Sequence, residues 1–72
     1  MELKVVSLKG IEFEGEATSV NIQTELGEIT VLDHHRPLVT VLRPGIAHIT
    51  TSTGEQKEIE VQSGFLEMGP DN

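Results

Sequence analysis

The sequence predicts an all-β fold, a small β-sandwich of short, mostly antiparallel strands. Apolar residues recur at every second position, which is the period of strands with one buried face. Glycine, proline and small polar residues separate the apolar runs at the short spacing of tight turns. A chain of 72 residues can bury only one core, so we expect residues 1–72 to form a single domain.

Apolar pairs at positions i and i+2 mark the expected strands in order along the chain. The pairs are Leu3 and Val5, Ile11 and Phe13, Val20 and Ile22, Ile29 and Val31, Ala47 and Ile49, and Ile59 and Val61. Turn signals fall between them, at Lys9-Gly10, Gly15, Gly27, Pro44-Gly45 and Ser52-Thr53-Gly54. No window predicts an amphipathic helix. The only aromatic residues are Phe13 and Phe65, which we assign to a core of mostly valine, isoleucine and leucine.

The balance of charge narrows the possible partners. Five Lys and Arg against twelve Asp and Glu give a net charge of −7. Such a surface repels phosphate backbones and anionic headgroups, so neither nucleic acid nor direct membrane insertion is expected. The absence of cysteine fits a cytoplasmic location, and the small core favours a protein partner. The acidity alone is equally explained by the solubility of a small monomer.

Catalysis would need a nucleophile with a base, a metal-ligand set or paired acids. His34 and His35 are adjacent and would point to opposite sides of an extended segment, and His48 has the outward parity of its strand. No serine lies in a nucleophile elbow, and no glycine cluster precedes a helix. We therefore predict no catalytic residue, no cofactor and no metal site. A carrier domain that displays Lys57 is an alternative, although the Asp-Lys or Met-Lys context of lipoyl and biotinyl domains is missing.

The most informative segment is Gly-Glu-Ile-Thr-Val-Leu-Asp-His-His-Arg-Pro-Leu-Val-Thr-Val-Leu-Arg-Pro-Gly, from Gly27 to Gly45. It resembles the epsilon subunit of F-type ATP synthases, whose N-terminal domain carries Gly-Glu, a short apolar strand, Leu-Pro-Gly-His-Ala-Pro-Leu and a strand ending in Lys-Pro-Gly. Two more segments are similar to that family. Phe13 to Val20 looks like its Phe-x-Gly-x-x-x-x-Val pattern, and Ser63 to Met68 looks like Ser-Gly-Gly-Phe-Leu-Glu-Val.

The chain departs from the family pattern at two points of the central segment. Asp33-His34 stands where the family has Pro-Gly, and Arg36 stands where it has alanine. The family normally continues beyond the position of Asn72 with one more apolar strand, and often with a C-terminal helical hairpin. We expect residues 1–72 to lack that strand and hairpin, and with them the hairpin's inhibition of ATP hydrolysis and its binding of ATP.

The resemblance implies a non-catalytic rotor subunit of the central stalk, cytoplasmic and peripheral to the membrane. In that family the sandwich binds the gamma subunit and rests on the c-subunit ring, which couples ion-driven rotation to ATP synthesis. By position, Glu28 would face the ring and His35 would face the gamma subunit. Leu38, Leu42 and Leu66 are candidates for apolar contact with the gamma subunit, and burial of all three within the sandwich is the open alternative.

Two further expectations concern assembly. A free-standing acidic β-sandwich that serves as a binding or carrier module is the alternative to a rotor subunit. The expected lack of the final strand predicts one unpaired sheet edge, through which a homodimer could form by strand pairing.

Overall fold

The computed structural model describes residues 1–33 and 37–69. These residues form seven strands: β1 (Glu2–Ser7), β2 (Gly10–Thr24), β3 (Gly27–Leu32), β4 (Leu38–Leu42), β5 (Gly45–Thr51), β6 (Gln56–Val61) and β7 (Gly64–Met68). Every strand pairing is antiparallel. The predicted all-β fold is therefore confirmed, and within the described ranges there is no helix long and apolar enough to cross a membrane.

One long strand, β2, replaces two strands that the sequence predicted on either side of a turn at Gly15. The turn prediction is wrong, because Gly15 lies within β2 and pairs with Leu3 on β1. A Cβ atom at Gly15 would lie 3.7 Å from the ring of Phe13, which is an ordinary van der Waals contact, so this position needs neither a turn nor a glycine for space. The strand changes direction further on, where its pairing with β5 shifts register between Ala17 and Ser19.

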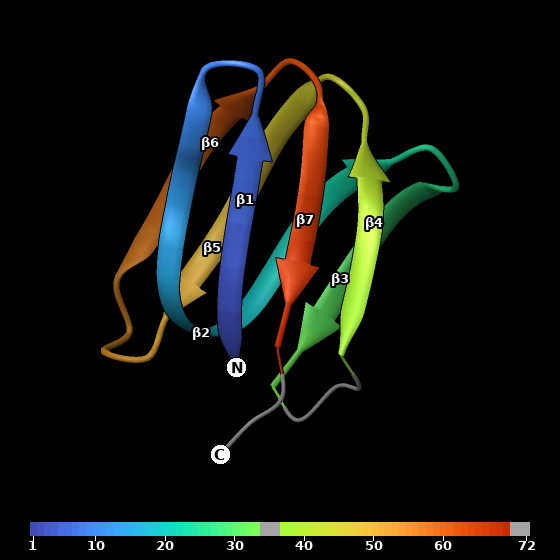
Figure 1. Cartoon of the computed structure of the whole chain (residues 1–72). Coiled ribbons are helices and arrows are strands. Elements are labelled where there is room, and N and C mark those ends of the chain that lie inside the picture. Colours follow the sequence, from blue (N-terminus) through green and yellow to red (C-terminus); the bar gives the residue numbers. More distant parts are fainter. Residues whose placement is uncertain (34–36, 70–72) are drawn as a thin grey trace.

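The bend in β2 produces two layers. The first half of β2 pairs with β1, and the pairing continues through β7 to β4. The second half of β2 pairs with β3 on one side and with β5 on the other, and β5 pairs with β6. Figure 1 shows the two layers face to face, with β2 passing from one to the other. We refer to β2–β1–β7–β4 as the first sheet and to β3–β2–β5–β6 as the second sheet.

The layers also meet at the far end of β2. Thr24 pairs with Leu42 of β4. Arg43 donates its N–H to the carbonyl oxygen of Gln23 at 3.0 Å, and Glu25 donates its N–H to the carbonyl oxygen of Val41 at 3.2 Å. The two sheets of the sandwich are thus also joined by backbone hydrogen bonds between β4 and the end of β2.

The core lies between the layers and is supplied by alternate residues of both sheets. Its buried apolar members are Met1, Leu3, Val5, Ala17, Val20, Ile22, Val31, Leu42, Ala47, Ile49, Val61, Leu66 and Met68. Phe13 packs against this cluster, as the sequence predicted, together with Ile29, Leu38 and Ile59. Phe65 does not, because its parity on β7 turns it to the outer face, where it is 40% exposed.

Candidate functional site

A row of apolar side chains crosses the outer face of the first sheet. Val41 of β4 pairs with Phe65 of β7, Phe65 pairs with Val6 of β1, and Val6 pairs with Ile11 of β2. The four residues therefore lie side by side in one register, and we call them the apolar row. Ile11 is 58% exposed and Val41 is 50% exposed. Because these apolar side chains adjoin one another, the outer face of the first sheet is a candidate contact surface.

A second row, made of three charged residues and the exposed Val39, borders the apolar row. Val39 pairs with Glu67, Glu67 with Lys4, and Lys4 with Glu14, in the adjacent outward-facing register of the same four strands. Lys4 and Glu14 form an ion pair with 3.7 Å between Nζ and Oε2. An apolar centre with a charged rim is the common arrangement of protein interfaces.

The outer face of the second sheet is more polar, and its two exposed apolar side chains, Leu32 (63% exposed) and Ile46 (50% exposed), lie on different strands, β3 and β5. Asn21 donates its side-chain N–H to the hydroxyl of Thr30 at 2.7 Å, and Asn21 pairs with His48 on the next strand. Nδ1 of His48 lies 3.2 Å from Oε2 of Glu58. Thr30, Asn21, His48 and Glu58 thus form a chain of polar side chains across four strands, which we call the polar row. The centre of this face is therefore occupied by polar contacts and not by a continuous apolar surface.

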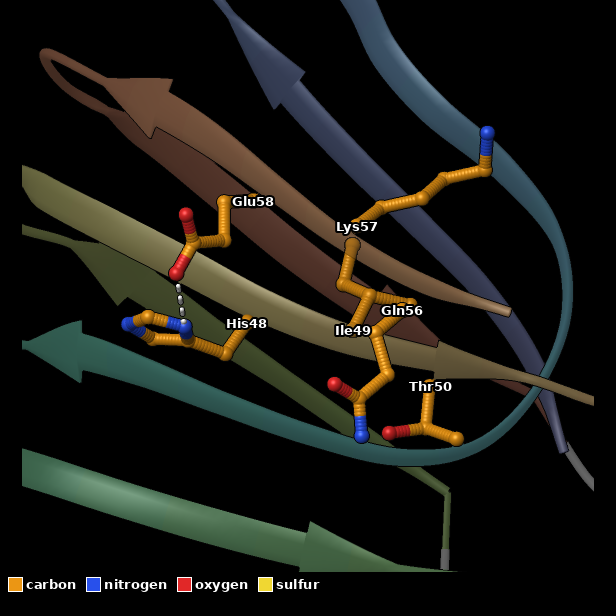
Figure 2. Close-up of a pocket in the computed structure, with 6 residues that line it drawn as sticks. All are labelled: His48, Ile49, Thr50, Gln56, Lys57 and Glu58. Carbon is orange, nitrogen blue, oxygen red and sulfur yellow. Dashed lines mark ion pairs between the residues drawn. The ribbon is translucent and has the colours of Figure 1, made fainter. Parts of the chain in front are cut away.

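A shallow pocket lies over β5 and β6 on this polar side. Figure 2 shows His48 and Glu58 facing each other, with Thr50 and Gln56 nearby and Lys57 pointing away from the pair. His48 is exposed, as its parity predicted. No nucleophile stands next to a base here, and the described residues contain no group of three His, Cys, Asp or Glu side chains that could hold a metal ion.

Lys57 is a poor match for a carrier lysine. It lies within β6 and not at the tip of the β5–β6 turn, and its Nζ is 3.6 Å from Oε1 of Glu55. The geometry therefore gives no support to a modified lysine displayed on a hairpin tip.

Four tight turns gather at one end of the sandwich. The register runs in one line through Gly10, Ser7, Gly64, Leu42, Thr24 and Gly27. The turns that join β1 to β2, β2 to β3, β4 to β5 and β6 to β7 therefore share this end, which we call the turn end. In Figure 1 the β2–β3 turn lies at the right and the other three lie at the top.

Two leucines project from the turn end. Leu8 in the β1–β2 turn is 92% exposed, and Leu26 in the β2–β3 turn is 90% exposed. Buried Thr24 holds the second turn, since its hydroxyl donates to the carbonyl of Gly27 at 2.8 Å and accepts the N–H of Leu26 at 3.1 Å. Gly27 has a φ of +112°, which a side chain would strain. This turn therefore fixes the position of Glu28, which follows it directly at the start of β3.

The opposite end contains an ionic contact at Asp33. The α-ammonium group of Met1 lies 2.7 Å from Oδ1 of Asp33 and donates to the carbonyl of Ala17 at 2.9 Å. Asp33 is one of the two positions where the sequence departs from the family pattern. Its carboxylate links the start of β1 to the end of β3 through this ionic contact.

Comparison with known proteins agrees with this geometry. Residues 1–72 match the profile of the family described as "ATP synthase, Delta/Epsilon chain, beta-sandwich domain". The chain belongs to this family. It is 42% identical over 66 residues to the ATP synthase epsilon chain of Xanthomonas campestris pv. campestris (strain B100), with 92% of this chain and 47% of that protein covered. The epsilon chain of Xylella fastidiosa (strain Temecula1) is 44% identical over 66 residues, with the same coverage.

A third relative, the ATP synthase epsilon chain of Stenotrophomonas maltophilia (strain K279a), is 42% identical over 66 residues. The chain spans about half the length of these curated relatives, since the match covers 47% of each. Family membership confirms the resemblance that the Gly27–Gly45 segment indicated.

The structure separates the predicted epsilon-type contact residues. Glu28 is exposed at the turn end. Leu42 and Leu66 are buried in the core, so the burial alternative holds for both. Leu38 is half-buried at the other end of β4, packed against the core. His35 lies outside the described residues, so its predicted role stays a prediction.

Sequence reasoning missed the apolar row. Each of its members looks like an ordinary strand residue, and Phe65 was assigned to the core. The row exists only because of register, including the shift between Val5 and Val6 that brings Val6 opposite Ile11 and Val5 opposite Phe13. The sequence alone places Ile11 and Phe13 on the same face, because they are two positions apart. Only the register shift in the β1–β2 pairing shows that Ile11 faces outward while Phe13 packs against the core.

Proposed function

We propose that the chain is the β-sandwich of a non-catalytic rotor subunit of ATP synthase. In this proposal it binds the gamma subunit with the outer face of the first sheet and rests on the c-subunit ring with the turn end. It would thereby help to couple ion-driven rotation to ATP synthesis, at the cytoplasmic side of the membrane and without inserting into it. Membership of the delta/epsilon family supports the role, and the contrast between the two sheet faces carries the assignment of surfaces.

The gamma contact is assigned to the apolar row because affinity between proteins depends on buried apolar area. Fully burying an exposed Val, Ile or Phe side chain stabilises an association by about 1.5–3 kcal/mol. Val41, Phe65 and Ile11 are each about half exposed, so each could contribute roughly half of that amount on docking. The polar row offers no comparable gain. Leu38 and Leu42 share the inward parity of β4, with Leu38 packed against the core and Leu42 buried, which argues against a direct role for either on this face.

The ring contact is assigned to the turn end because Glu28 lies there with the two projecting leucines. A carboxylate at this position could pair with a basic residue on a ring loop. An exposed ion pair contributes only about 0–1 kcal/mol, so Glu28 would set register and association rate more than affinity. Leu26 and Leu8 would supply the apolar part of the contact, since their side chains are 90% and 92% exposed.

The gamma contact can be tested by titrating the protein with the gamma subunit from the same source and measuring heat of binding. Phe65→Ser should weaken binding at least tenfold, since it removes the largest side chain of the apolar row. The matched control is Thr50→Ala on the outer face of the second sheet, which should leave affinity unchanged. Equal affinity of wild type and Phe65→Ser, with both folded by circular dichroism, would rule out this surface.

The ring contact requires its own pair of variants. Glu28→Gln should slow association with the assembled c-subunit ring, most clearly at low salt, while Glu58→Gln on the polar row should not. Association measured by surface plasmon resonance at two salt concentrations separates a charge effect from a folding effect. If Glu28→Gln and Glu58→Gln have the same association rate at both salt concentrations, Glu28 does not contact the ring.

A further inference from the structure

One carboxylate on the outer face of the first sheet has no counter-charge. Glu67 lies on β7, which has β1 on one side and β4 on the other, so it lies inside the sheet and not at its edge. Its side chain is exposed, and among residues 1–33 and 37–69 no ion pair involves its carboxylate. Lys4 is its neighbour in register, but Nζ of Lys4 lies 3.7 Å from Oε2 of Glu14 instead.

The second row, made of Val39, Glu67, Lys4 and Glu14, holds more negative than positive charge. Lys4 lies between the two carboxylates, with one on each neighbouring strand. Whichever carboxylate Lys4 pairs with, the other is left without a cation. The row therefore keeps one uncompensated negative charge, and in the structure it is that of Glu67.

This charge adjoins the apolar row. Phe65 and Glu67 are two residues apart on β7 and both face outward, with buried Leu66 between them. Side chains at such positions are about 7 Å apart along a strand. Val41 and Val39 have the same relation on β4. The two rows thus run side by side across the sheet.

A stable protein contact needs more area than the apolar row provides. Strands lie about 4.8 Å apart, and side chains on one face lie about 6.8 Å apart along a strand, so a row across four strands covers roughly 130 Å² of sheet. A standard interface buries about 800 Å² on each partner. On one side of the apolar row the sheet stops, because the next pair in register, Leu42 with Gly64, belongs to the turn end. The remaining sheet surface lies on the other side, so a partner seated on the apolar row also covers the second row.

Covering the second row takes Glu67 out of water. A buried carboxylate is costly unless a cation and hydrogen bonds compensate it. Lys4 is the only cation of the two rows, so the missing one must come from the partner. We propose that the surface of the gamma subunit that binds this chain carries a lysine or arginine that pairs with Glu67, beside an apolar strip that covers Phe65. Glu67 is then a specificity residue, since a partner with an apolar strip alone would bind more weakly.

This inference rests on the proposed gamma contact and adds the chemistry of the partner. Arginine suits the position best, because its planar guanidinium pairs with both oxygens of a carboxylate and also stacks on aromatic rings. Phe65 lies beside Glu67 on the same face, so one guanidinium can contact the carboxylate and the ring together.

Dissociation rates separate a covered charge pair from a peripheral one. Loss of one member of a covered pair mainly speeds dissociation, whereas loss of a peripheral charge mainly slows association. In surface plasmon resonance of the whole chain on immobilised gamma subunit, Glu67→Gln should speed dissociation about tenfold and change the association rate less than about twofold. Glu67→Lys opposes two cations and should weaken binding about a hundredfold.

Glu60→Gln is the matched control, because it changes the net charge by the same amount. Glu60 is an exposed carboxylate opposite Ile46 on the outer face of the second sheet, and in the described part of the chain it too makes no ion pair. Its association and dissociation rates should equal those of wild type. Both glutamine variants replace an exposed side chain, so their midpoints of urea unfolding should match that of wild type.

Two results would overturn the inference and leave the gamma contact in place. One is that Glu67→Gln has the rates of Glu60→Gln while Phe65→Ser weakens binding. The other is tighter binding by Glu67→Gln, since the carboxylate would then be covered without a cation. If neither Phe65→Ser nor Glu67→Gln changes binding, the first sheet does not bind the gamma subunit and the proposed surface fails as well.

Discussion

Gly64 offers the sharpest test of the packing, because a side chain there has no space. It opens β7, pairs with both Ser7 and Leu42, and has a φ of +154°. A Cβ atom at Gly64 would overlap the carbonyl oxygen of Val6 and would lie 2.8 Å from the Cα atom of Ser7. Both neighbours are backbone, so no side chain can rotate away. Gly64→Ala must therefore move β7 and β1 apart.

The size of the effect follows from two contributions. Backbone strain at a non-glycine residue in this region costs about 1–3 kcal/mol. Separation of the strands would also weaken pairing at the turn end and loosen Leu66, which is fully buried two residues later. We expect Gly64→Ala to lower the free energy of unfolding by about 3 kcal/mol or more. A domain of this size is stable by about 4–10 kcal/mol in total, so the loss would be large.

Gly10→Ala is the matched control. Gly10 also has positive φ, at +123°, and also sits at a turn, but nothing lies within 4 Å of its Cβ position. It should cost only the strain, about 1 kcal/mol. Urea unfolding followed by circular dichroism measures both variants. If Gly64→Ala costs no more than Gly10→Ala, the close approach of β7 to β1 is wrong.

Other variants test individual contacts by the same unfolding measurement. Leu66→Ala should cost about 2–5 kcal/mol because Leu66 is buried, whereas Leu8→Ala at the exposed turn end should change stability by less than about 0.5 kcal/mol. Thr24→Val keeps the shape of the side chain but removes both hydroxyl bonds of the β2–β3 turn, and should cost about 1–2 kcal/mol. Asp33→Asn should cost about 1 kcal/mol by weakening the contact with the Met1 ammonium group; Glu16→Gln, whose carboxylate is 3.5 Å from that group and mostly exposed, should cost less.

The strands could be predicted from the sequence because apolar alternation reports one buried face. That signal worked for the pairs Leu3 and Val5 and Ile29 and Val31, whose burial matches their parity. It was insufficient at Gly15, where the glycine lies inside a strand and marks no turn. It also could not locate the layers, because the bend in β2 depends on pairing with strands that are distant in sequence.

The surfaces were harder to predict than the strands. Periodicity shows that side chains alternate between two faces of a strand, but not which face is buried. The sequence therefore could not decide whether Leu42 and Leu66 lie in the core or at an interface. Pairing decides it: Leu42 lies opposite Gly64 and in the inward register, whereas Val41, its neighbour, lies opposite Phe65 on the outer face. Motif resemblance identified the family, and the register identified which strand residues form the apolar row.

The shared strand β2 has a mechanical consequence. Because its two halves belong to different layers, the layers cannot slide past each other unless β2 gives up hydrogen bonds in both of them. A twisting load applied at the turn end enters β2 at both of its ends and is carried along covalent backbone, with several ladders sharing the shear. A domain that transmits torque between two neighbouring proteins would gain resistance to shear from this shared strand, without needing a larger core.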